Sequence, residues 1–126
     1  NMLVAFTAWG NRISPVFDES TSFFIVEIFD GKILKSFVKY CDPEMYWHSI
    51  EMLKMLKIDI IICGAISELL LRIVESTGIK IIPFIGGRIE EIIEFLIKNE
   101  QIPTTLMMPG ALDIRANLRT KEFKIK

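Results

Sequence analysis

The sequence predicts a single α/β domain with a five-stranded mixed sheet and three helices, and two patterns carry this prediction. In the first half, two β-rich runs flank Asp30-Gly31, a dipeptide typical of tight hairpin turns because both turn positions adopt positive φ. In the second half, apolar strands alternate with amphipathic helices, the pattern of parallel strands joined by helical crossovers. With 126 residues, 51% of them hydrophobic, the chain is long and apolar enough to form the hydrophobic core of one such domain.

The first half is expected to supply three strands, at residues 3–6, 23–29 and 33–40. The second and third strands pair through the Asp30-Gly31 turn and are antiparallel neighbours. Lysines interrupt the third strand, which suits an exposed edge of the sheet.

The second half is expected to alternate three helices, at 42–57, 66–77 and 88–99, with strands at 58–63 and 79–84. Asp42 is the predicted N-cap of the first helix, and Gly78 closes the second in a left-handed conformation. In the second helix, Leu69 and Leu70 are predicted to face the core. Right-handed crossovers place the fourth strand beside the first, which gives the order 3-2-1-4-5 with strand two antiparallel. This is a ribonuclease H-like sheet.

Residues 2–100 therefore form the predicted domain, and residues 101–126 form a basic C-terminal tail. The tail has two prolines near its start and little periodicity. One interpretation is a frayed terminus, and the other is a segment that docks on a neighbouring subunit or partner. Its basic residues are Arg115, Arg119, Lys121, Lys124 and Lys126.

Bulk composition excludes several classes of partner. A net charge of −1 and an isoelectric point near 5.9 supply no basic field for nucleic acid. No apolar stretch is long enough to cross a membrane, because Asp59, Gly64 and Glu68 interrupt the most apolar one. With two cysteines and no export signal, we expect a reduced, cytoplasmic protein.

The expected ligand site lies where the strand order reverses, between strands one and four. Three segments meet there, at residues 8–17, 63–67 and 85–88. Their glycines permit close backbone approach, and the helices that follow offer free N–H groups to an anion, although plain strand-to-helix turns explain the glycines equally well. The candidate ligand-binding residues are Trp9, Asn11, Arg12, Ser14, Gly64, Ser67, Gly86 and Arg88.

Cys63 is the candidate metal ligand. It ends the fourth strand, where the following helix N-terminus favours a thiolate, and the alternative is an inert buried cysteine. Cys41 is expected at the far end of the sheet, away from the site.

Catalysis is not expected. Metal-dependent nuclease chemistry on this sheet needs a carboxylate from the first strand, and residues 3–7 contain none. His48, the one histidine, has no nucleophile elbow to complete a hydrolase triad. We therefore predict that the protein is not an enzyme.

Three segments resemble the dinitrogenase iron-molybdenum cofactor biosynthesis family, the NifX-like and NifB C-terminal-like domains. These segments are Ile13-Ser-Pro-Val-Phe17, the apolar run at 22–28 and the turn at 30–31. In addition, Cys63-Gly-Ala-Ile-Ser67 approximates the Gly-Gly-Ile-Gly sequence of the family. The resemblance covers residues 2–99 and implies the ribonuclease H-like fold. It also implies non-catalytic binding or carrying of an iron-sulfur or iron-molybdenum type cluster, with a cluster donor or acceptor protein as partner.

The alternative is a metal-free protein-interaction or regulatory module of the same fold. Trp47 lies on the polar side of the first helix, where an indole implies a subunit contact or packing against the tail. Together with the lysine-rich third strand and the basic tail, it would form a contact surface for a partner or a homo-oligomer. The small number of thiols favours this alternative, and the loop at 8–17 favours the cluster.

Overall fold

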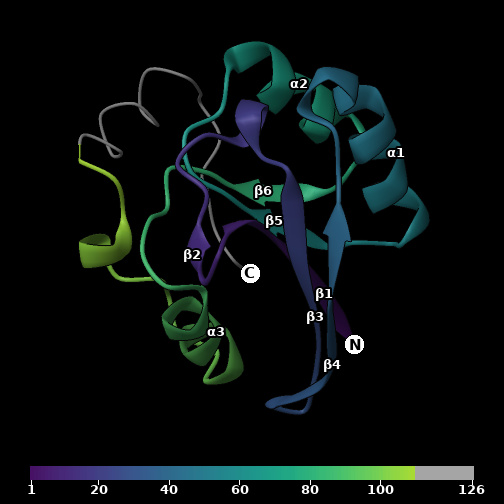
Figure 1. Cartoon of the computed structure of the whole chain (residues 1–126). Coiled ribbons are helices and arrows are strands. Elements are labelled where there is room, and N and C mark those ends of the chain that lie inside the picture. Colours follow the sequence, from purple (N-terminus) through teal and green to yellow (C-terminus); the bar gives the residue numbers. More distant parts are fainter. Residues whose placement is uncertain (110–126) are drawn as a thin grey trace.

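The computed structural model describes residues 1–109, which fold into one mixed sheet covered by helices on both faces (Figure 1). The sheet has the order β4-β3-β1-β5-β6, which confirms the predicted order of the five main strands. β1 is antiparallel to β3 and parallel to β5, and β5 is parallel to β6. The main strands are β1 Met2–Trp9, β3 Ser22–Phe29, β4 Lys32–Tyr40, β5 Ile60–Ile62 and β6 Lys80–Ile82.

The helices begin later than the sequence predicts. Asp42 caps a short 3-10 turn at Pro43–Met45, because its carboxylate accepts a hydrogen bond from the Glu44 amide at 2.9 Å, and only then does the first α-helix start. Gly78 ends the second helix with a φ of 87°, as predicted. No helix within residues 1–109 has the length and apolar character that a membrane span needs. The helices are α1 Tyr46–Met55, α2 Glu68–Ser76 and α3 Ile89–Ile97.

The segment after β1 is a second hairpin instead of an open loop. β2, at Arg12–Ile13, pairs antiparallel with the end of β1. Gly10 has a φ of 61°, which suits the first central position of a type II′ turn. The Gly10-Asn11 dipeptide is itself a hairpin signal, so this strand was within reach of sequence reasoning.

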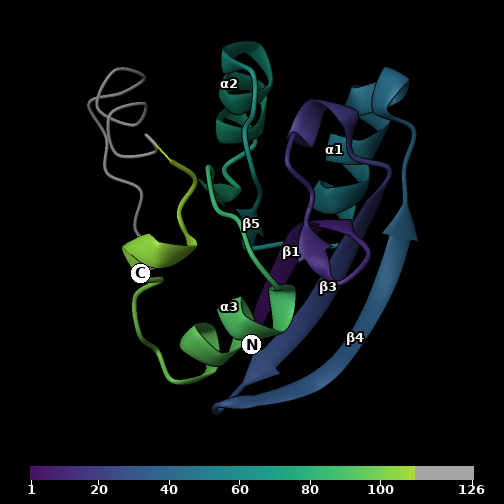
Figure 2. The same ribbon diagram turned by 60° about the vertical axis from the view of Figure 1, so that its left-hand side comes forward.

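Two hydrophobic cores lie on opposite faces of the sheet, one under α1 and α2 and one under α3. Figure 2 shows α3 on the other side of the sheet from α1 and α2. The predicted core face of α2 is wrong at Leu69, whose side chain is 62% exposed, whereas Leu71 is buried. Three consecutive leucines span more than half of the helix circumference, so periodicity does not decide which outer one faces the sheet.

Thr7, near the end of β1, is fully buried, and its hydroxyl has no hydrogen-bond partner in residues 1–109. We expect Thr7→Val to raise the free energy of unfolding by about 1 kcal/mol, because the substitution keeps the shape and removes an unsatisfied polar group. The Thr77 hydroxyl donates to the Val74 carbonyl and accepts from the Ile79 amide, so Thr77→Val should lower stability instead. Urea unfolding of both variants measures the difference, and equal changes would contradict the prediction.

The first part of the predicted tail packs on its own domain. Ile102 is buried in the core under α3, and the Met108 amide donates to the Phe84 carbonyl at 2.8 Å. Met107 forms an antiparallel bridge with Ile85. Residues 101–109 thus extend the fold at the end of β6, while the basic residues of the predicted tail lie outside the described part of the chain.

Candidate functional site

The loop that follows β2 is attached to the end of β5 by main-chain contacts. The Phe17 amide donates to the Ala65 carbonyl at 2.7 Å, and the Ala65 amide donates to the Pro15 carbonyl at 2.8 Å. Gly64 permits this approach, since a Cβ at that position would lie 2.4 Å from the Pro15 oxygen. We call these contacts the loop clasp. The loops predicted to meet at the strand reversal therefore lie at the same edge of the sheet.

Residues on either side of β2 contact the N-termini of two helices. At α2, the Asp18 carboxylate accepts from the Ser67 amide at 3.0 Å, and the Ser67 hydroxyl accepts from the Leu70 amide at 3.3 Å. At α3, the Asn11 carbonyl accepts from the Ile89 amide at 2.9 Å. The amides of Ser67, Leu70 and Ile89, at the helix starts predicted to favour an anion, therefore bind atoms of the chain itself. In this structure Ser67 is the N-cap of α2.

Three of the candidate residues form a line across the strands at this edge. Trp9 is the cross-strand partner of Arg12, and Arg12 in turn is bridged to Arg88. Antiparallel partners project their side chains on the same face, so Trp9, Arg12 and Arg88 all project from one face as neighbours. All three residues are exposed, and Arg88 forms an ion pair with Glu90. We call these three side chains the Trp-Arg-Arg row.

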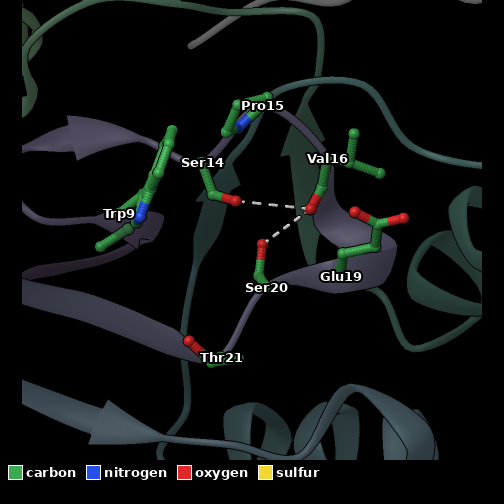
Figure 3. A pocket seen from close by; sticks show the side chains of 8 residues that line it. Trp9, Ser14, Pro15, Val16, Glu19, Ser20 and Thr21 are labelled. Atoms are coloured by element: carbon green, nitrogen blue, oxygen red, sulfur yellow. Dashed lines mark hydrogen bonds between the residues drawn. The ribbon is translucent and has the colours of Figure 1, made fainter.

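A pocket of about 370 Å³ lies beside the row (Figure 3). Trp9 borders one side of it and Glu19 the other, with Ser14 and Ser20 between them. Both serine hydroxyls donate to the Val16 carbonyl, at 3.5 Å and 2.9 Å, so each presents oxygen lone pairs to further donors. The pocket thus combines an indole face, hydroxyl oxygens and one carboxylate.

Other candidates lie away from this pocket. Asn11 lines a different, mainly apolar groove of about 430 Å³ between α3 and the β3–β4 hairpin. The Gly86 amide donates to the Leu106 carbonyl at 2.7 Å, so this glycine contacts the segment after α3. Gly64 is buried under the clasp. The sequence-predicted residues therefore divide among the pocket, the clasp and the opposite face of the sheet.

Cys63 is fully buried in the core under α1 and α2. Burial raises the pKa of its thiol, and the nearby Asp18 charge raises the pKa further. The expectation that a helix N-terminus favours its thiolate is wrong, because α2 starts five residues later and the amides at its start bind Asp18 and Ser67. As folded, Cys63 is a neutral core side chain.

Cys41 lies at the site edge, contrary to the expectation that it lies at the far end. β1 and β4 are both antiparallel to β3, so they point the same way and end at the same edge. The Cys41 thiol donates to the Ser20 carbonyl at 3.4 Å, and Ser20 lines the pocket. Partial burial raises its pKa, and a hydrogen bond with Ser49 opposes that shift. Within residues 1–109, no group of three or more His, Cys, Asp or Glu side chains is placed to hold a metal ion.

Sequence reasoning missed two features of this edge. Glu19, Ser20 and Thr21 line the pocket, and the only local signal was a run of polar residues between two apolar segments. Phe84 has a φ of 65°, a left-handed conformation that bulky residues rarely adopt. Its amide donates to the Gly64 carbonyl at 2.9 Å, which ties this backbone to the clasp.

Comparisons with known proteins agree with this architecture. Residues 1–99 match the protein family described as dinitrogenase iron-molybdenum cofactor. A search of curated proteins finds no match. The crystal structure of the PH0822 protein is similar with a TM-score of 0.71 at 22% identity, covering 79% of this chain and 91% of that protein.

Two further solved structures share the fold. The MJ0327 protein from Methanococcus jannaschii has a TM-score of 0.67 at 25% identity, over 79% of this chain and 89% of its own. The TM1290 protein from Thermotoga has a TM-score of 0.58 at 16% identity, over 83% of this chain and 95% of its own. Because the family match spans the whole sheet and all three helices, the chain belongs to the dinitrogenase iron-molybdenum cofactor family.

Proposed function

We propose that this protein binds and carries a metallocluster of the iron-sulfur or iron-molybdenum type, or a precursor of one, without catalysing a reaction on it. Membership in the dinitrogenase iron-molybdenum cofactor family supports a metallocluster as the ligand. The observation that carries the proposal is the pocket beside the end of β1, most of whose walls belong to a loop fixed by main-chain hydrogen bonds. A loop held in this way presents Ser14 and Glu19 on a backbone that needs little further ordering on binding.

The side chains at the pocket suit loose, transferable binding. A full set of metal ligands is missing from residues 1–109, so few direct bonds to the metal are available. Glu19 would supply a carboxylate ligand, and Cys41 would supply a thiolate ligand if metal binding displaces its proton to solvent. The remaining contacts are hydrogen bonds and charge. We propose that a donor or acceptor protein exchanges the cluster at this open edge.

Cys63 also remains a proposed ligand, under one condition. Its thiol is enclosed in the core, so it reaches a cluster only if residues 14–17 leave the end of β5. Ligation by Cys63 therefore predicts opening of the clasp, whereas ligation by Cys41 does not.

Anaerobic reconstitution of the full chain with iron and sulfide tests the proposal. We expect visible charge-transfer absorption and bound iron, with several-fold less iron in Glu19→Gln and Cys41→Ala than in the unmodified protein. Glu51→Gln, on the exposed side of α1, is the matched control. Equal iron retention in Cys63→Ala would exclude Cys63 as a ligand.

The alternative function is that of a metal-free interaction module, and one observation favours it. Trp47 on α1 is 54% exposed and packs edge to face on Tyr46, with ring centroids 5.3 Å apart. An exposed indole on a helix surface is typical of a protein contact, because tryptophan is enriched at interface hot spots. If the protein takes up no iron under anaerobic conditions, this alternative becomes the better proposal.

A further inference from the structure

We propose that Arg12 and Arg88 form a recognition site for multiply charged oxyanions, with Trp9 as its apolar wall. The inference deepens the proposed function, since a cluster rich in sulfide carries negative charge and would meet the same two guanidinium groups. It also extends beyond that function, because such a site binds anions that contain no metal.

The first argument is the register of the bridge between the two arginines. The bridge is bracketed by two main-chain hydrogen bonds of 2.9 Å, from the Ile13 amide to the Gly87 carbonyl and from the Ile89 amide to the Asn11 carbonyl. This pattern defines a pair that is not itself hydrogen-bonded, in which opposite side chains approach most closely. The neighbours Ile13 and Ile89 point into the core, so the arginines point outward.

The second argument is the charge balance at that pair. Like charges placed directly opposite on neighbouring strands are destabilising. Glu90 neutralises Arg88 in part, but no acidic side chain in residues 1–109 forms an ion pair with Arg12. Glu90 and Glu91 both lie in the first turn of α3, and the Asn11 carbonyl already binds the Ile89 amide, so the positive charge left unpaired at this bridge is that of Arg12. An anion between the guanidinium groups would relieve this repulsion.

The third argument concerns the shape of the anion. Guanidinium groups bind oxyanions through two parallel N–H bonds, so two adjacent arginines suit an anion with several oxygens better than a monatomic ion. Trp9, with 72% of its surface exposed, continues the row on the side of the pocket. A ligand of this kind therefore lies across the row, with its charge on the arginines and a less polar part against the indole.

Tryptophan fluorescence of the metal-free full chain tests this site. In a Trp47→Phe background, Trp9 is the only tryptophan and reports on the row. We expect pyrophosphate to cause a saturable change, and Arg12→Gln or Arg88→Gln to weaken its affinity about tenfold each. Arg72→Gln, on the exposed side of α2, is the matched control and should leave the affinity unchanged.

Circular dichroism confirms that each variant is folded before titration. Unchanged pyrophosphate affinity in both arginine variants would overturn the inference, and so would an equal response to chloride at the same ionic strength. The experiments distinguish a failure of the proposed cluster binding from a failure of the proposed anion site. If the protein binds pyrophosphate but takes up no iron, the proposal of cluster binding is wrong and the anion site is supported. If it takes up iron but does not respond to pyrophosphate, the anion site is wrong and cluster binding is supported.

Discussion

Gly64→Ala is expected to lower the free energy of unfolding by about 3 kcal/mol or more, because the added methyl group overlaps main-chain atoms that are themselves hydrogen-bonded. The new Cβ would lie 2.4 Å from the Pro15 oxygen and 2.5 Å from the Ser14 oxygen. Relief requires the loop to leave the end of β5, which breaks both hydrogen bonds of the clasp. Denaturant unfolding measures the loss, and iron retention should fall with it.

Gly10→Ala is the matched control for this experiment. Gly10 has a positive φ of 61° but nothing within 4 Å of the position of its absent Cβ, so only backbone strain of about 1 kcal/mol is expected. Gly64, in contrast, carries a steric cost. If the two substitutions destabilise the protein equally, close packing of the clasp is not what fixes the loop.

Phe17→Ala is expected to cost about 3 to 5 kcal/mol, the usual loss when a buried aromatic side chain is removed from a core. Phe17 is 6% exposed and packs edge to face on Phe23, with ring centroids 6.0 Å apart. Its ring anchors the pocket loop in the core under α1 and α2. Loss of the ring should therefore loosen the loop and weaken ligand binding as well as stability.

Urea unfolding together with limited proteolysis checks the Phe17 prediction. Cleavage within residues 10–20 should become faster than cleavage elsewhere in the domain. Phe29→Ala removes a ring of the same size that is 54% exposed, and it should change stability by less than about 1 kcal/mol. If Phe17→Ala and Phe29→Ala lower the free energy of unfolding by similar amounts, burial of the Phe17 ring does not hold the loop in place.

The topology could be predicted because its signals are local in sequence. Asp30 and Gly31 have φ values of 53° and 72°, as the hairpin dipeptide indicates. The apolar strands that precede α2 and α3 likewise carry their own pattern, and the crossover rule then fixes their order. Each of these inferences depends on a few neighbouring residues.

The site could be predicted only in outline, because its contacts join residues that are distant in sequence. Asp18 binds the Ser67 amide across 49 positions, and no local pattern distinguishes that carboxylate from an exposed one. Cys41 was placed at the wrong end of the sheet, although the predicted strand directions already implied that β4 ends beside β1. The burial of Cys63 agrees with the alternative that the sequence offered, an inert buried cysteine, because its apolar strand is covered on both faces.

The clasp has a consequence for how this site can diverge among proteins of the same fold. Its hydrogen bonds use main-chain atoms of Pro15, Phe17 and Ala65, which most residue types would supply equally well. The side chains that face the ligand are thus largely released from holding the loop in place. Substitutions in the row or at Glu19 are then free to alter charge and shape, so new cargo specificity can arise while the backbone path stays the same.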